Sequence, residues 1–322
     1  MIQEKSRKNM ITTERLKSLG VLWALLALCL IASAISPNFR SVSNLINVVR
    51  NISINGIIAI GMSFVILTGG IDLSVGATVN VVASVVAICF INGVSPVMAC
   101  VIGILCGAGI GCINGIGITK GNVAPFIMTL GTVTAFSGLA MYITGGAPQS
   151  WRKSNVEFEF LGRGSIGGIP TPIFVFVAMI IIAFIILKYT VFGRNVYAIG
   201  DSREAARLSG INVHKVEIIV YTISGIMAGI SSLVLMSRLG VGEPTSGDGC
   251  ELDAIAMVVI GGISSSGGSG SVLGTVVGAA LLSVLANLLN LVGISPFVQK
   301  IVKGCIIIAA VLLERFTKKQ KA

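Results

Sequence analysis

Asp72 is the single acidic residue of a long apolar stretch, and it lies between Gly70 and Gly76. A carboxylate within a membrane span costs about 2.5 to 3.5 kcal/mol on insertion scales, so a role must offset that cost. Two interpretations stay open. Asp72 and Ser74 could line an unwound segment that a polar substrate passes. Alternatively, the same two residues could cap the helix that follows at a membrane face.

Asn287 and Asn290 are three residues apart, which places them one turn apart on a helix. Amides donate and accept hydrogen bonds without carrying charge, so they suit the recognition of substrate hydroxyl groups. They also join helices inside membranes, with an average contribution of about 0.6 kcal/mol per hydrogen bond. Asn80 and Asn114 allow the same two interpretations. For all four, the sequence leaves substrate recognition and helix packing open.

The sequence lacks the patterns that covalent or nucleotide chemistry needs. It has no GxxxxGK[ST] loop, no HExxH motif and no Ser/His/Asp set at usable spacing. Its one histidine, His214, lies in a basic loop, and the seven cysteines form no metal-ligand spacing. We therefore expect no catalytic residue, no metal site and no cofactor bound by this chain.

The composition predicts an all-α, polytopic membrane protein and excludes a soluble enzyme. Of the 322 residues, 54% are hydrophobic and only 11% are charged. Ten apolar runs could each supply a transmembrane helix, although the eighth is short and could instead re-enter the membrane. The runs are Leu19–Ile35, Ser53–Gly69, Leu73–Ile91, Val97–Thr119, Val123–Thr144, Ile173–Tyr189, Ile218–Leu239, Ala254–Ile263, Val272–Val292 and Pro296–Leu313. Residues 19–313 are then a single transmembrane domain.

The basic residues predict the orientation of that domain. Most of the 23 lysines and arginines lie in the tails 1–18 and 314–322, at Lys120, or in a loop at about 190–216 and its flanks. Positive charge favours the cytoplasmic side, and ten crossings place all these segments on one side. We therefore expect both termini in the cytoplasm. The charge has no interleaved aromatic pattern, so nucleic acid is not an expected partner.

Glycines recur every four residues in two of the predicted spans. Gly103, Gly107, Gly111 and Gly115 form one such ridge, and Gly270, Gly274 and Gly278 begin another. Missing side chains let a second helix backbone approach closely. The ridges predict tight packing inside the bundle, with a dimerisation surface as the alternative.

The basic loop contains a short predicted helix. Asp201 with Glu204 three residues later forms a capping pattern, Ala205 and Ala206 favour helix, and Gly210 ends it. A short charged helix of this kind could dock into a groove on another protein. It could equally be a solvated loop that only fixes the topology.

The segment Glu204-Ala205-Ala206, followed by Gly210, resembles the "EAA…G" coupling loop of bacterial ABC importer permeases. The rest of the chain, from about Ser36 to Leu313, resembles the ribose-type monosaccharide permeases of that class. The motifs that carry this resemblance are Gly70-Ile71-Asp72-Leu73-Ser74-Val75-Gly76, Glu251-Leu252-Asp253-Ala254-Ile255-Ala256, Val259-Ile260-Gly261-Gly262-Ile263-Ser264 and Asn287-Leu288-Leu289-Asn290-Leu291.

The resemblance implies a permease subunit that imports a monosaccharide, with ribose expected, across the bacterial inner membrane by alternating access. It implies three protein partners: a second permease copy, an ATPase subunit that binds ATP and Mg²⁺, and a periplasmic or lipid-anchored sugar-binding protein. The residues expected to couple to the ATPase are Asp201, Arg203, Glu204, Ala205, Ala206 and Gly210. The expected substrate path contains Asp72, Ser74, Asn287 and Asn290. The alternative is a secondary sugar transporter driven by H⁺ or Na⁺, with Asp72 binding the ion.

Overall fold

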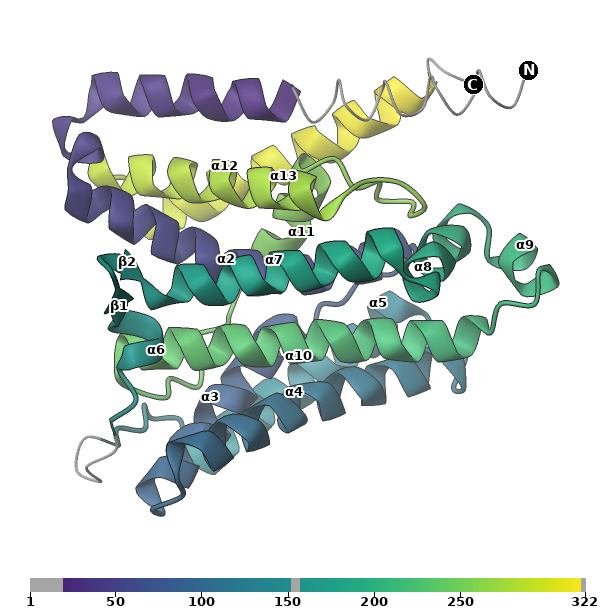
Figure 1. Ribbon diagram of the computed structural model, residues 1–322, viewed down its shortest axis with the longest axis horizontal. Coiled ribbons are helices and arrows are strands. Elements are labelled where there is room, and N and C mark those ends of the chain that lie inside the picture. The colour runs from purple at the N-terminus through teal and green to yellow at the C-terminus, as the bar shows by residue number, and fades with distance from the viewer. Residues whose placement is uncertain (1–19, 152–156, 320–322) are drawn as a thin grey trace.

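The computed structural model describes residues 20–151 and 157–319, and its regular structure is almost entirely helical (Figure 1). The predicted tail 1–18 and residues 320–322 lie outside the described residues. The long elements are the helix Gly20–Ile35, α2 (Val42–Leu67), α3 (Val75–Ile91), α4 (Pro96–Thr119), α5 (Pro125–Thr144), α7 (Thr171–Tyr189), α10 (Val213–Leu239), α12 (Val272–Leu291) and α13 (Pro296–Lys319). The short elements are η1 (Pro37–Arg40), α6 (Phe160–Arg163), α8 (Val191–Asp201), α9 (Arg203–Leu208), α11 (Cys250–Ile260) and the hairpin β1 (Ser165–Ile166) with β2 (Ile169–Pro170).

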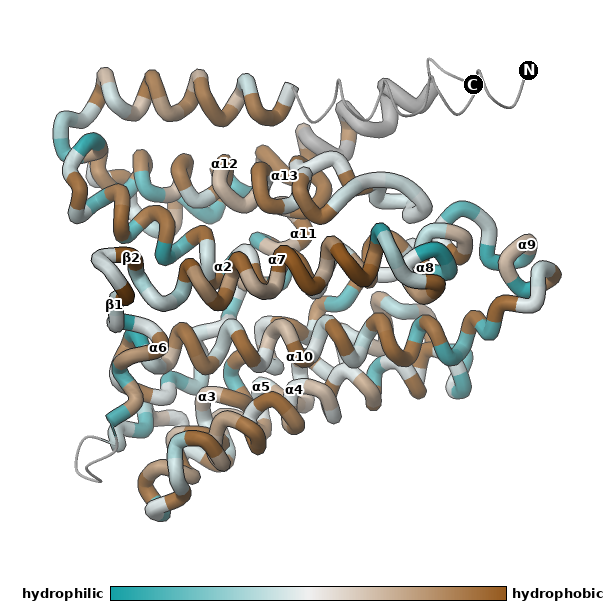
Figure 2. Tube along the Cα trace, viewed as in Figure 1, coloured by the Kyte–Doolittle hydropathy of each residue, from teal (hydrophilic) through white to brown (hydrophobic). Residues whose placement is uncertain are grey.

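The structure confirms the all-α, polytopic class. Within residues 20–151 and 157–319, six helices are long and apolar enough to cross a membrane, namely α2, α4, α5, α7, α10 and α12. Hydrophobic residues run along most of α7, whereas hydrophilic residues gather near α8 and α9 (Figure 2). The predicted eighth span corresponds to α11, which has 11 residues. At 1.5 Å per residue it is about 16 Å long, roughly half of a hydrocarbon core.

Several helices begin or end outside the apolar runs that predicted them, and α2 and α13 differ the most. The second helix begins at Val42 and not at Ser53, because polar residues interrupt the apolar pattern without interrupting the helix. Asn44 pairs with Asn287, and Asn51 accepts a hydrogen bond from Arg238, so each of these amides has a partner. The last helix continues past Leu313 to Lys319, into the predicted tail 314–322.

The glycine ridge of α4 faces α10, as the packing interpretation predicted. A Cβ atom at Gly107 would clash with the carbonyl oxygen of Gly225, and one at Gly111 with that of Tyr221. At Gly115 it would lie 2.7 Å from the Cα atom of Ile218. The ridge therefore brings the two helix backbones together. The second ridge packs in the same way at Gly274 and Gly278, which lie against backbone of α11 and of Gly261, the residue that follows it. The prediction was wrong for Gly270, which precedes α12 with φ of +125° and is not part of the helix.

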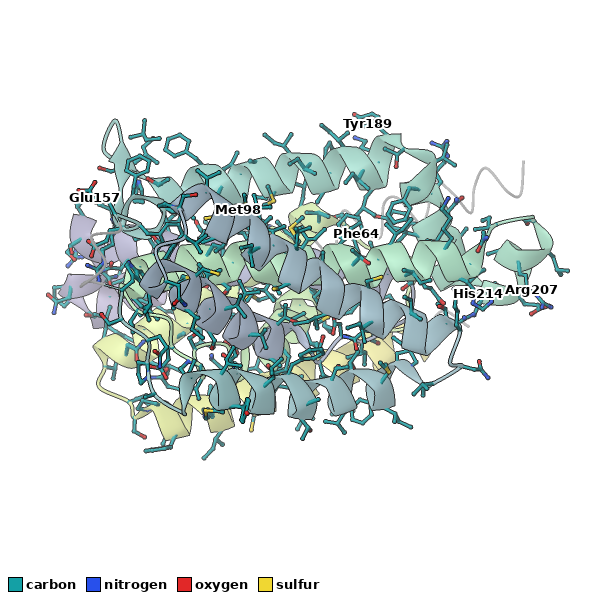
Figure 3. All side chains as sticks on the ribbon, turned by 90° about the horizontal axis from the view of Figure 1, so that it is seen from below. Phe64, Met98, Glu157, Tyr189, Arg207 and His214 are labelled. Atoms are coloured by element: carbon teal, nitrogen blue, oxygen red, sulfur yellow. The ribbon has the colours of Figure 1, made fainter. Side chains whose placement is uncertain are left out.

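The helix bundle has two differently built ends. The first, here the α6 end, contains α6, the β hairpin and residues 145–151 and 240–249, which are joined by a bridge between Gln149 and Gly242. The second, here the α9 end, contains α8, α9 and residues 264–271 (Figure 1). Glu157 marks the α6 end in Figure 3, and Arg207 with His214 marks the α9 end.

The ridge generates a prediction for the substitution Gly111→Ala. The added methyl group meets the α10 backbone, so the helices must separate, at a cost of about 1 to 3 kcal/mol. The melting temperature of the purified protein, followed by size-exclusion chromatography after heating, should fall.

Gly109→Ala is the matched control, because a Cβ atom at Gly109 meets nothing within 4 Å. This variant should melt at or slightly above the wild-type temperature, since alanine favours helix over glycine. Equal melting temperatures for the two variants would contradict the close approach of α4 to α10.

Candidate functional site: an exposed helix and a buried polar cluster

The predicted short helix exists as α9, but Asp201 does not cap it. Asp201 is the last residue of α8, and the cap is Ser202, whose Oγ accepts a hydrogen bond from the amide nitrogen of Ala205 at 3.2 Å. The cap prediction was therefore wrong by one residue, because a preceding helix, α8 (Val191–Asp201), includes Asp201. Gly210 follows the helix with φ of +83°, and the amide of Ile211 donates to the carbonyl of Ala206. This left-handed glycine ends the helix as predicted.

Helix α9 projects beyond the ends of the neighbouring helices (Figure 1). Arg203, Glu204 and Ala205 are exposed, and Leu208 is 78% exposed, a high value for a leucine. Ala206 is the exception, since it is 4% exposed and belongs to the main hydrophobic core. One face of α9 is thus anchored, while the other offers a leucine surrounded by charges.

The outer face of α9 carries an ion pair that is open to solvent. Arg207 Nη2 lies 2.8 Å from Glu204 Oε1, and both side chains are about two-thirds exposed or more. Exposed ion pairs contribute about 0 to 1 kcal/mol, so little is lost when either member changes partner. Both charges are therefore available to another protein.

A second ion pair fixes α9 to the bundle. Arg203 Nη2 lies 2.9 Å from Glu217 Oε2, and the Glu217 side chain is only 6% exposed. Glu217 was missed in the sequence analysis. The available signal was an acidic residue four positions into α10, directly after the basic loop.

Helix α8 packs closely against the end of α2 and against residues 264–271. A Cβ atom at Gly200 would clash with the carbonyl oxygen of Leu67, the last residue of α2. The same carbonyl accepts a hydrogen bond from the amide of Gly268, and Tyr197 Oη donates to the carbonyl of Gly270 at 3.0 Å. The end of α2, α8 and residues 264–271 therefore meet through their backbones.

Asp72 lies in a buried polar cluster that joins three helices. Its Oδ1 accepts hydrogen bonds from the amide of Ser74 at 2.9 Å and from Ser74 Oγ at 2.6 Å. Its Oδ2 accepts one from Ser224 Oγ of α10 at 2.7 Å. Asn114 of α4 donates in turn to Ser74 Oγ at 2.7 Å. Asp72 is 1% exposed, so the carboxylate is satisfied by these donors directly before α3 begins at Val75.

The predicted cap of α3 is not confirmed, because Ser74 is the N-cap residue but makes no side-chain cap hydrogen bond, and Asp72 bonds Ser74 itself. The carboxylate folds back on Ser74 in the manner of an Asx turn. It also reaches α10, which the sequence did not predict. Substrate contact by Asp72 and Ser74 stays a prediction.

The asparagine amides have partners on other parts of the chain. Asn287 and Asn44 exchange two hydrogen bonds, of 2.8 and 3.0 Å, between α12 and α2. Asn290 Oδ1 accepts one from Gln299 Nε2 of α13 at 2.8 Å. Asn80 bonds both Asp248 Oδ1 and the amide of Gly247 at 2.7 Å. These bonds fit the helix-packing interpretation, and substrate contact by Asn287 and Asn290 stays a prediction.

In the part of the chain that the structure describes, no three histidine, cysteine, aspartate or glutamate side chains are grouped as a metal site would need. The exposed helix α9 is instead suited to docking, and the buried Asp72 cluster is suited to holding helices together.

Comparison with known proteins gives these features a context. Residues 44–311 match the family described as "Branched-chain amino acid transport system / permease component". The chain belongs to this family.

The curated relatives cover nearly the whole chain. The "Ribose import permease protein RbsC" of Bacillus subtilis (strain 168) is 45% identical over 300 residues, 93% of each chain. The protein of the same name in Escherichia coli (strain K12) is 40% identical over 320 residues, 99% of each chain. The "Xylose transport system permease protein XylH" of Escherichia coli (strain K12) is 33% identical over 88% of this chain and 87% of its own. No solved structure matches the chain.

Family membership confirms the resemblance noted from the motifs. This chain is a membrane-embedded transport component and not an enzyme. The roles of α9 and of the Asp72 cluster are therefore to be sought in helix movement and in contacts with partner proteins.

The buried cluster generates a prediction for Ser224→Ala. The substitution removes the donor to Asp72 Oδ2 and leaves a buried carboxylate oxygen unsatisfied, at a cost of about 1 to 3 kcal/mol. The melting temperature of the purified protein should fall accordingly.

Ser84→Ala is the matched control. Ser84 is equally buried, but its Oγ donates to the Asn80 carbonyl within the same helix, so its loss leaves no buried carboxyl group without a donor. This variant should lose clearly less stability. Equal destabilisation by Ser84→Ala and Ser224→Ala would show that the hydrogen bond from Ser224 to Asp72 contributes no more stability than that of an ordinary hydroxyl within a helix.

Proposed function

We propose that this chain is the membrane-spanning permease subunit of an ABC importer that carries a monosaccharide, ribose in the first place, across the bacterial inner membrane. The observation that carries the proposal is 45% identity to a ribose import permease over 93% of both chains. The exposed, capped and anchored α9, which contains the Glu204-Ala205-Ala206 motif, supports the ABC class independently.

The proposed topology has about ten crossings, with the α9 end and both tails in the cytoplasm. The transmembrane domain comprises residues 19–313, and the coupling loop comprises about 190–216. The α6 end then faces outward and receives the sugar from a periplasmic or lipid-anchored binding protein. The charge bias supports this orientation, since Arg194, Arg203, Arg207 and Lys215 lie at the α9 end.

The proposed ATPase subunit binds ATP and Mg²⁺ and docks on α9. Glu204 and its partner Arg207 supply exposed charges, and Leu208 supplies an apolar anchor. Three further residues hold α9 in place. Arg203 ties α9 to α10, Ala206 packs in the hydrophobic core, and Gly210 ends the helix. Asp201 ends α8, directly before Ser202, the cap residue of α9.

A second permease copy completes the proposed translocation path. Nucleotide binding and hydrolysis in the ATPase subunit move α9, and the helices reorient around the sugar in alternating access. Asp72, Ser74, Asn287 and Asn290 remain the candidate path residues of this proposal.

The sugar assignment is tested by uptake in a strain that lacks this chain. Accumulation of radiolabelled ribose should be lost, and a plasmid that carries the gene should restore it. Loss of xylose accumulation with intact ribose accumulation would contradict the assignment.

The docking role of α9 generates a prediction for Glu204→Lys. Charge reversal places a lysine beside Arg207, so the groove of the ATPase subunit meets an altered charge pattern on an intact helix. The affinity for the ATPase subunit should fall about tenfold or more, equivalent to about 1.4 kcal/mol. Copurification from membranes measures the loss.

Glu159→Lys is the matched control. It reverses the charge of another exposed glutamate that pairs with an arginine, Arg163, at the α6 end. The ATPase subunit should copurify with this variant as with the wild type. Normal recovery of the ATPase subunit with Glu204→Lys would show that α9 is not the docking element.

A further inference from the structure

Helix α10 connects the two polar features described above. Glu217, Tyr221 and Ser224 are spaced by four and three residues, so they share one face of the helix. All three are at most 5% exposed. The helix runs from the α9 end toward α6 (Figure 1), and Ser224 lies about 10 Å further along it than Glu217.

The end of this face nearer α9 is held by the Arg203–Glu217 ion pair. The pair is charge-assisted and short, at 2.9 Å, and the glutamate is withdrawn from water. Moving Arg203 away would leave a buried carboxylate without its cation, which is strongly unfavourable. Arg203 and α10 must therefore move together or separate at a large cost.

The other end of the face holds the turn between α2 and α3. Ser224 Oγ donates to Asp72 Oδ2 at 2.7 Å, and the hydroxyl of Tyr221 lies 3.4 Å from the carbonyl oxygen of Ile71. The hydroxyl also packs against Gly70, where a Cβ atom would lie 2.5 Å from it. Displacement of α10 along its axis would remove donors and packing from residues 70–74.

We propose that Glu217 is a positioning residue for transport, which transmits the movement of α9 through α10 to the turn formed by residues 70–74. The inference rests on the proposed function, because it takes α9 as the element that the ATPase subunit moves. Helix α10 acts as a rigid connector, with the Arg203–Glu217 pair as its input and the Ser224–Asp72 bond as its output. The Asp72 cluster then has two arrangements, with and without the donor from α10.

The experiment measures hydrogen–deuterium exchange in the purified complex of this chain with its ATPase subunit, in lipid nanodiscs, with and without ATP and vanadate. In the wild type, peptides that cover residues 203–208 and 68–74 should both change their exchange rates when nucleotide is trapped. In Glu217→Gln, residues 203–208 should respond as before, whereas the response of residues 68–74 should fall about fivefold or more.

The outcomes separate this inference from the proposed function. An absent response at residues 203–208 in the wild type would refute α9 as the docking element. A normal response there, with an undiminished response at residues 68–74 in Glu217→Gln, would overturn the role of Glu217 alone. The route would then run through the backbone contacts of Gly200 with Leu67.

A second readout is the number of sugar molecules imported per ATP hydrolysed in proteoliposomes that also contain the binding protein. Glu217→Gln and Arg203→Gln should each lower this ratio about fivefold or more, and the double variant should be no worse than either single variant. Arg203→Lys keeps the charge and should restore most of the ratio. Additive losses in the double variant would overturn the pair as one connection.

Discussion

The burial of the Asp72 carboxylate is the constraint on which the rest of the structure depends. A carboxyl group at 1% exposure is tolerated only when hydrogen-bond partners surround it, and Ser74 and Ser224 supply them. These donors come from the turn before α3 and from α10, and Asn114 adds α4 through Ser74. The carboxylate thus fixes how three helices meet, and the glycine ridge of α4 brings the backbones close enough for it to do so.

The exposed helix follows the opposite physical rule. Its outer charges and Leu208 remain in water, where they cost little to rearrange, while Ala206 and the Arg203–Glu217 pair fasten its inner side. An element that receives force from a partner needs both properties. A loop that only fixed the topology would need neither the buried anchor nor the ion pair.

The all-α membrane class, the long apolar helices and the short helix α9 could be predicted from sequence, because each depends on a local pattern of residues. Apolar runs predicted the helices, Gly210 predicted the end of α9, and the glycine spacing predicted the packing of α4. The start of α2 was missed because polar side chains such as Asn44 find partners more than 200 residues away, and the cap of α9 was missed because α8 continues to Asp201. Glu217 and Ser224 were missed because their importance comes from Arg203 and Asp72, which only the fold brings to them.

The most direct test of the whole account is sugar uptake by proteoliposomes that contain this chain, its ATPase subunit and its binding protein. The account predicts that ribose accumulates only when ATP reaches the ATPase subunit, and that ionophores which dissipate H⁺ and Na⁺ gradients leave accumulation intact. Accumulation by this chain alone, driven by an ion gradient and abolished by Asp72→Asn, would contradict it and make Asp72 an ion-binding residue.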